Sequence, residues 1–179
     1  PYSGFAPLAK EHDLGLAFAE TLTNKQLEAA RVLSERPIDV FEGPGQRGKL
    51  AQFAGLSSAD LSLEQLSALQ QLTREFVENG NRDAAGEHLD AIAAAGWRKL
   101  WFVWQGPVSA DAPFYYRVHG ERILIEYNLQ DLNHDHAVVR DPANDYGEDW
   151  LGAHLTEQHP SSLEVRQSLG LLPADEQKE

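Results

Sequence analysis

The spacing of apolar residues predicts helices in the first third of the chain. Leu14, Phe18 and Leu22 recur at intervals of four, which places them on one face of a helix. The residues that follow, 23–26 (TNKQ), form a capping-box pattern, in which a Thr and a Gln three residues later satisfy the free amides of a helix start. This pattern predicts a second helix, which Pro37 must end.

Two further helices are predicted after a connector, residues 37–60, that contains Gly and Pro and few periodic apolar residues. A second capping-box pattern, SLEQ at 62–65, opens a helix that stops at Gly80. A helix over 82–95 ends at Gly96. The apolar stripe of the first of these two helices is expected to face the core: Leu66, Leu69, Leu72, Phe76 and Val77.

Strand patterns replace helical ones after residue 100. A strand is predicted over 100–105, where Leu100, Phe102 and Trp104 alternate with Trp101, Val103 and Gln105. Three short strands follow between Pro113 and Asp141. We therefore predict an α+β fold, with a helical N-terminal half, a three- to four-stranded antiparallel meander and a short C-terminal helix after residue 142. Residues 1–172 are expected to form a single α+β domain, with one last helix over 160–172 and a flexible acidic tail over 173–179.

The first hairpin of the meander is expected to turn at Gly120-Glu121, because a two-residue loop beginning with Gly suits a type II′ turn. This register places Tyr115 opposite Glu126 and Arg117 opposite Leu124. Alternation then divides the side chains between two faces. One face is apolar and is expected to be core: Phe114, Tyr116, Val118, Ile123, Ile125, Tyr127, Ala137 and Val139.

The other face is too polar to be core: Tyr115, Arg117, Glu126, Asn128, His134, His136 and Arg140. The short connection 129–133 predicts a second hairpin that pairs Asn128 with His134 and Glu126 with His136. Two His and one carboxylate on one face are a common ligand set for zinc or non-haem iron, and more imidazoles would suit copper. A slip of one residue in the second turn would separate Glu126 from the histidines. The plain alternative is a face exposed to water.

Other histidines are weighed as further ligands. His154, in the predicted short C-terminal helix, is the best candidate for a third imidazole, and a helix-surface position is the alternative. His119 shares the polar face but lies two paired rows from Glu126, about 13 Å along the strands, which is too far for the same ion. His12, His88 and His159 are expected to be surface residues: each stands in a polar context.

Composition narrows the classes of partner and ligand. The 179 residues carry 28 acidic and 15 basic side chains, a formal charge of −13, which disfavours nucleic acid and anionic membranes as partners. There is no apolar run of membrane-spanning length. The absence of Cys means that a metal must bind N and O donors. The absence of both Cys and Met favours an oxidising, extracytoplasmic setting: periplasmic, cell-surface or secreted.

The strand region also resembles a known family, called domain of unknown function 3500. The resemblance is most specific in residues 114–155 and extends over most of the chain. It departs from the family pattern at Asp135, where members have a bulky aliphatic residue, and in the shorter loop 129–133. The resemblance implies a shared fold and a shared site, and a chain that is the C-terminal part of a longer or processed precursor. The matching positions are Tyr115, Tyr116, Arg117, Glu126, Asn133, His134, His136, Arg140, Asp145, Gly147 and His154.

Three functions follow from these residues. We favour a metal-dependent redox enzyme that acts on a small molecule and holds one copper, zinc or iron ion. Tyr115 would support a ligand or act as a redox partner, and Arg117 or Arg140 would steer a small anion to the metal. A zinc-dependent hydrolase is the first alternative, with Glu126 as ligand or base. The second is a non-enzymatic metal-binding module of a secreted or cell-surface assembly, in which the polar face meets a protein partner.

Overall fold

The computed structural model describes residues 7–43, 46, 48–50, 52–144, 154 and 158. The chain divides into two compact units, residues 1–145 and 146–179. All helices and strands named below belong to the first unit. In the second unit the two described residues are helical, and the predicted helix over 160–172 and the tail over 173–179 lie outside the described residues.

The predicted helices of the N-terminal half are confirmed. They are α1 (Ala9–Glu20), α2 (Asn24–Ala30), α3 (Leu63–Glu78) and α4 (Arg82–Ala95). Both capping boxes are formed. At the start of α2 the backbone amide of Gln26 donates to the Thr23 hydroxyl, and the Gln26 side chain accepts from the backbone amide of Thr23. Ser62 and Gln65 make the same two bonds at the start of α3. Helix α2 is shorter than predicted and ends before Pro37 is reached.

The sheet has five antiparallel strands in chain order, one more than the upper limit of the prediction. They are β1 (Leu56–Ser57), β2 (Trp101–Gln105), β3 (Tyr115–Gly120), β4 (Ile123–Asp131) and β5 (His134–Arg140). The additional strand, β1, lies in the connector next to the 3₁₀ turn Ser58–Asp60, and a second such turn, Trp97–Lys99, precedes β2. The α+β class is confirmed.

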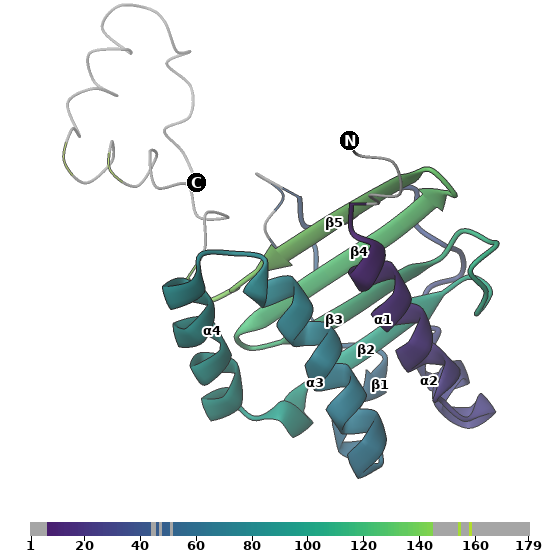
Figure 1. Ribbon diagram of the computed structural model, residues 1–179, viewed down its shortest axis with the longest axis horizontal. Helices are drawn as coiled ribbons and strands as arrows, with labels where there is room; N and C mark the ends of the chain where they lie inside the picture. Colours follow the sequence, from purple (N-terminus) through teal and green to yellow (C-terminus); the bar gives the residue numbers. More distant parts are fainter. Residues whose placement is uncertain are drawn as a thin grey trace, which may run out of the picture. The chain divides into compact units, whose positions relative to one another are not determined.

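Helices α1 and α3 cover the apolar face of the sheet (Figure 1). Phe18 of α1 meets Phe102 edge to face, with ring centroids 4.7 Å apart. The Tyr116 hydroxyl donates to the carbonyl of Glu11 at 2.7 Å, which ties β3 to α1. Aromatic rings stack from strand to strand across this face, with Trp104, Tyr116 and Tyr127 nearly parallel. The predicted core face is thus the helix-covered face, except that Val139, predicted to be core, is 37% exposed.

The described helices include none that is long and apolar enough to cross a bilayer. The longest of them, α3, has sixteen residues and buries only one side.

Two helical glycines provide a test of this packing. A Cβ at Gly15 of α1 would collide with the buried Tyr116 ring, whereas a Cβ at Gly86 of α4 meets nothing within 4 Å. We expect Gly15→Ala to lower the free energy of unfolding by roughly 1–3 kcal/mol because Tyr116 cannot move aside. We expect Gly86→Ala, the matched control, to raise it by about 0.5–1 kcal/mol. Denaturant titration measures both, and equal effects would contradict close packing of α1 on β3.

Candidate functional site

The first hairpin has a different register from the predicted one. Arg117 lies opposite Glu126 and Tyr115 opposite Asn128, and the turn residues are Glu121 and Arg122 instead of Gly120 and Glu121. The predicted pairing is therefore wrong by two residues. Since side chains alternate with a period of two, a shift of two keeps every side chain on its predicted face.

The second hairpin is shifted in the same way. His136 lies opposite Asn128, and Glu126 lies opposite Val138. A bulge between Leu129 and Asp131 offsets the end of the ladder near His134. The predicted pair of Glu126 with His136 is wrong, because the histidines lie further toward the end of the hairpin.

The connector covers the centre of the polar face, and only the end that carries His134 and His136 is open to water. Glu126 and Asn128 are fully buried although they face away from the helices. The Glu126 carboxylate accepts the amides of Phe41 and Glu42, at 2.9 and 2.8 Å, and the Tyr115 hydroxyl at 2.7 Å. Both oxygens are therefore occupied by donors, and this carboxylate holds the connector on the sheet.

A buried ion pair continues this face toward the other end of the sheet. Arg140 Nη1 lies 2.6 Å from Glu42 Oε2. The Glu42 carboxylate also accepts the amides of Gly48 and Leu50, at 3.2 and 2.7 Å. This second buried carboxylate folds the connector back on itself above β5.

Beneath the connector, the number of buried positive charges equals the number of buried negative charges. Two guanidinium groups, Arg117 and Arg140, lie among two carboxylates, Glu42 and Glu126, and all four residues are at most 4% exposed. No ion pair joins Arg117 to a carboxylate in the described part of the chain, and its Nε has no hydrogen-bond partner there. Its charge is balanced at longer range by Glu126 on the neighbouring strand.

The predicted catalytic residues Tyr115 and Arg117 lie in this buried layer. Burial and the Glu126 carboxylate raise the pKa of Tyr115 well above its usual value, so its hydroxyl stays protonated and donates. Both side chains are enclosed between sheet and connector. Their catalytic roles stay predictions, and the structure gives each of them a place in the interior.

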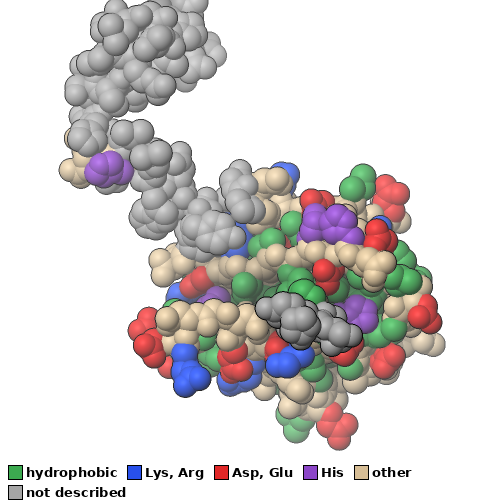
Figure 2. Space-filling model, turned by 45° about the horizontal axis from the view of Figure 1, so that its top comes forward, with side chains coloured by type: hydrophobic (Ala, Val, Ile, Leu, Met, Phe, Trp, Pro, Cys, Tyr) green, Lys and Arg blue, Asp and Glu red, His purple; other side chains and the backbone are tan. Residues whose placement is uncertain are grey.

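His134 and His136 are brought together as predicted. They lie on the exposed end of β5 with their Nε2 atoms 2.9 Å apart. The opposite nitrogen of His136, Nδ1, lies 2.6 Å from Asp39 Oδ1. This hydrogen bond is the main cause that lowers the pKa of Asp39. Figure 2 shows histidine side chains gathered on the surface next to acidic ones.

Asp39 is the residue that sequence reasoning missed. It lies 97 positions before His136, in the connector, and reaches the histidines only because the connector crosses the sheet. Its residue type in a turn-rich segment is ordinary, so the sequence carries no signal for it. Among the described residues, no group of three or more His, Cys, Asp or Glu side chains is placed to hold one metal ion together.

The two candidate additional imidazoles lie elsewhere. His119 is buried between Phe53 and β4, and burial together with Arg117 lowers its pKa to about 4. His154 belongs to the second unit, where it is helical and exposed. A part for His154 in the metal site stays a prediction.

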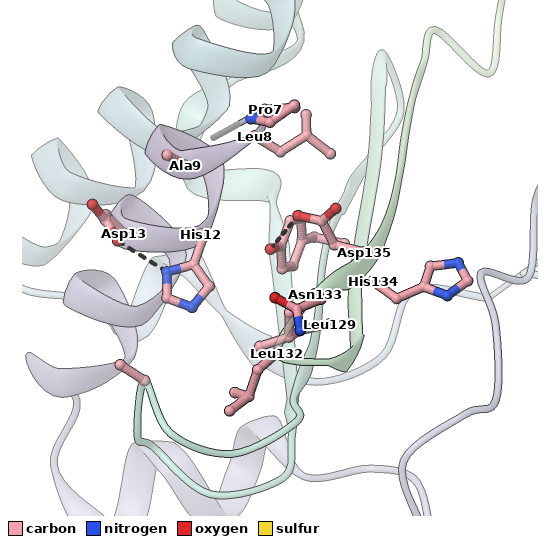
Figure 3. A pocket seen from close by; sticks show the side chains of 12 residues that line it. Pro7, Leu8, Ala9, His12, Asp13, Leu129, Leu132, Asn133, His134 and Asp135 are labelled. Atoms are coloured by element: carbon pink, nitrogen blue, oxygen red, sulfur yellow. Dashed lines mark hydrogen bonds and ion pairs between the residues drawn. The ribbon is translucent and has the colours of Figure 1, made fainter. Parts of the chain in front are cut away.

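A cavity of about 440 Å³ lies on the helix side of the same hairpin, lined in part by His12, Asp13, Tyr127 and Asp135. Figure 3 shows Asp135 turned toward the Tyr127 hydroxyl, which donates to it at 2.9 Å, while His134 points away. His12 contacts Phe114 and is not a plain surface residue. His134 also lines this cavity, although its ring points away from the other side chains there.

The structural part assigned to Glu126 can be tested by one isosteric change. In Glu126→Gln an amide group would face the donors of Phe41 and Glu42, and we expect a loss of roughly 2 kcal/mol in the free energy of unfolding. Glu121→Gln, in the exposed turn between β3 and β4, is the control and should be neutral. Denaturant titration compares them. Equal stability of the two variants would show that Glu126 does not anchor the connector.

The lowered pKa of His119 predicts a pH dependence. Because the folded state binds this proton more weakly than the unfolded chain, stability should fall as pH drops from about 6.5 to about 4. His119→Gln removes this titration. We expect the wild type to lose, relative to the variant, on the order of 1–3 kcal/mol of unfolding free energy across that window. Parallel pH curves for the two proteins would contradict a buried neutral imidazole.

Comparison with known proteins supports the family resemblance. The family model described as "Protein of unknown function (DUF3500)" matches residues 1–148, which include every strand of the sheet and end before His154. No curated protein and no solved structure matches the chain. The matched region covers the Tyr-Tyr-Arg strand, Glu126 and both histidines of β5. The chain belongs to the family described as Protein of unknown function (DUF3500).

Proposed function

We propose that this protein binds a transition-metal ion through His134 and His136. The observation that carries the proposal is the convergence of their Nε2 atoms, 2.9 Å apart on one face of β5. Two nitrogens bound at about 2.0 Å to a tetrahedral ion lie roughly 3.3 Å apart. A small rotation of the rings would therefore admit an ion between them.

The contact of Asp39 with His136 supports this proposal. Metal-binding imidazoles usually donate their other N–H to a carboxylate, which fixes the tautomer and makes the ligating nitrogen more basic. The His136 Nδ1 contact with Asp39 at 2.6 Å has this form. It leaves Nε2 of His136 as the lone-pair donor on the side of His134.

Copper is the metal that these ligands favour, because imidazole sites bind it most tightly among the divalent first-row ions. His136 and Asp39 are 39% and 54% exposed at their side chains, so solvent and small molecules reach the pair. Two protein ligands leave positions open on the ion. We propose redox chemistry on a small molecule at these positions, in an extracytoplasmic setting.

Hydrolysis has less support than redox chemistry. The predicted base, Glu126, is fully buried and accepts two amides and a hydroxyl. A general base must reach the attacking water. We therefore carry the metal-binding and redox proposal forward without Glu126 as ligand or base.

The test is metal content after native purification without chelator. We expect the double variant His134→Ala, His136→Ala to lose its copper, zinc or iron while circular dichroism and the denaturation midpoint stay close to wild type. His88→Gln is the control, because it removes a histidine that is hydrogen-bonded to the carbonyl of Arg122 and lies outside the proposed site. This variant should keep its metal. Equal metal content in the double variant and the wild type would end the proposal.

Two carboxylate variants refine this experiment. Asp39→Asn should weaken metal binding about 10- to 100-fold, because His136 loses its orienting partner. Asp111→Asn, in the exposed loop between β2 and β3, is its control. Glu126→Gln should lower stability and keep the metal. If the folded Glu126→Gln protein released its metal while Asp39→Asn kept it, Glu126 would act as a ligand as predicted and the proposed site would be wrong.

A further inference from the structure

A second cavity lies at the other end of the buried polar face, between the connector and the β3–β4 turn. It measures about 300 Å³, at the lower limit of small-molecule sites. Its walls are mostly apolar and come from the connector, β4 and the segment after β5: Leu50, Phe53, Leu124 and Pro142. Among the described residues that line this cavity, His119 is the buried polar residue with an unpartnered nitrogen.

The His119 imidazole has an unmet hydrogen-bonding capacity. The residue is only 6% exposed, and its Nδ1 has no hydrogen-bond partner among the residues that the structure describes. Phe53 meets the ring edge to face at a centroid distance of 4.7 Å and is itself half exposed. Buried polar atoms without partners are uncommon and costly, so each needs an explanation, and a bound molecule is one explanation that suits a residue lining a cavity.

Of the other charged groups at this cavity, Glu42 and Arg140 are paired with each other, and Glu121 is exposed in the β3–β4 turn. Glu42 accepts from Arg140 and from the amides of Gly48 and Leu50. The buried cations Arg117 and Arg140 are matched by the buried carboxylates Glu42 and Glu126. A charged guest would bring an uncompensated charge into this layer, which is costly in a low-dielectric interior.

We propose that this cavity binds a small uncharged molecule with an aromatic or aliphatic body and one hydroxyl group, which forms a hydrogen bond with His119. The apolar body would contact Phe53 and Leu124, and the hydroxyl would satisfy the imidazole. The site lies on β3 and β4 away from His134 and His136, and it does not depend on metal binding there.

Phenol is the probe for this site, with benzoate and benzylammonium as charged molecules of similar size. We expect phenol to shift the NMR signals of the His119 ring and the Leu124 methyls in a saturable way, and the two charged probes to bind at least about tenfold more weakly. Equal or tighter binding of either charged probe would overturn the proposed ligand class. A linear, unsaturable response to phenol would overturn the site.

Variants locate the binding within the protein. Phe53→Ala, at a half-exposed wall residue, should weaken phenol binding about tenfold with the fold retained. Ile38→Ala, an equally apolar but 89% exposed change in the connector, is the control and should bind phenol as the wild type does. His119→Phe should remove the hydrogen bond and cost about five- to tenfold. Unchanged affinity in folded Phe53→Ala would place the binding elsewhere and end the proposal.

Discussion

The buried carboxylate of Glu126 is the constraint on which the arrangement of this protein depends. A carboxylate at the centre of a sheet is costly unless donors surround it. Here the donors are two connector amides, of Phe41 and Glu42, and one hydroxyl, of Tyr115. Because two of them belong to the connector backbone, satisfying the charge brings a turn-rich segment against the strands. An antiparallel sheet with one polar face thus becomes covered on both sides (Figure 1).

The position of the connector decides what the exposed and buried groups can do. Toward one end of the polar face it carries Asp39 to His136, and the histidine pair gains a carboxylate partner. Toward the other end it closes over His119 and leaves the apolar-walled cavity there. Asn128 lies between the centre and the histidines, accepting from Arg36 and donating to the carbonyl of Pro37. The two proposed sites therefore share one scaffold, although they use different side chains.

Strand β5 links the two faces of the sheet near the hairpin end. Its alternation sends His134 and His136 to the connector side and Asp135 to the helix side, where Tyr127 donates to it. The bulge at Leu129 and Asp131 falls beside these residues, where it changes the ladder without breaking it. Asp135 replaces the bulky aliphatic residue expected from the family resemblance, and the structure gives it a defined bond. A charged residue at this position therefore has a structural partner on the face opposite the histidines.

Local patterns in the sequence determined the elements of this protein. Capping boxes, the stripe of α3 and the alternation of the strands act over a few residues, so the helices, most strands and both faces of the sheet follow from them. The register did not follow, because the choice between a turn at 120–121 and one at 121–122 depends on the packing of the whole hairpin. The tertiary structure alone decided that the centre of the polar face is buried, that Glu126 anchors the connector and that Asp39 meets His136. Those contacts join residues 84 to 97 positions apart, and only the folding of the connector over the sheet brings them within hydrogen-bonding distance.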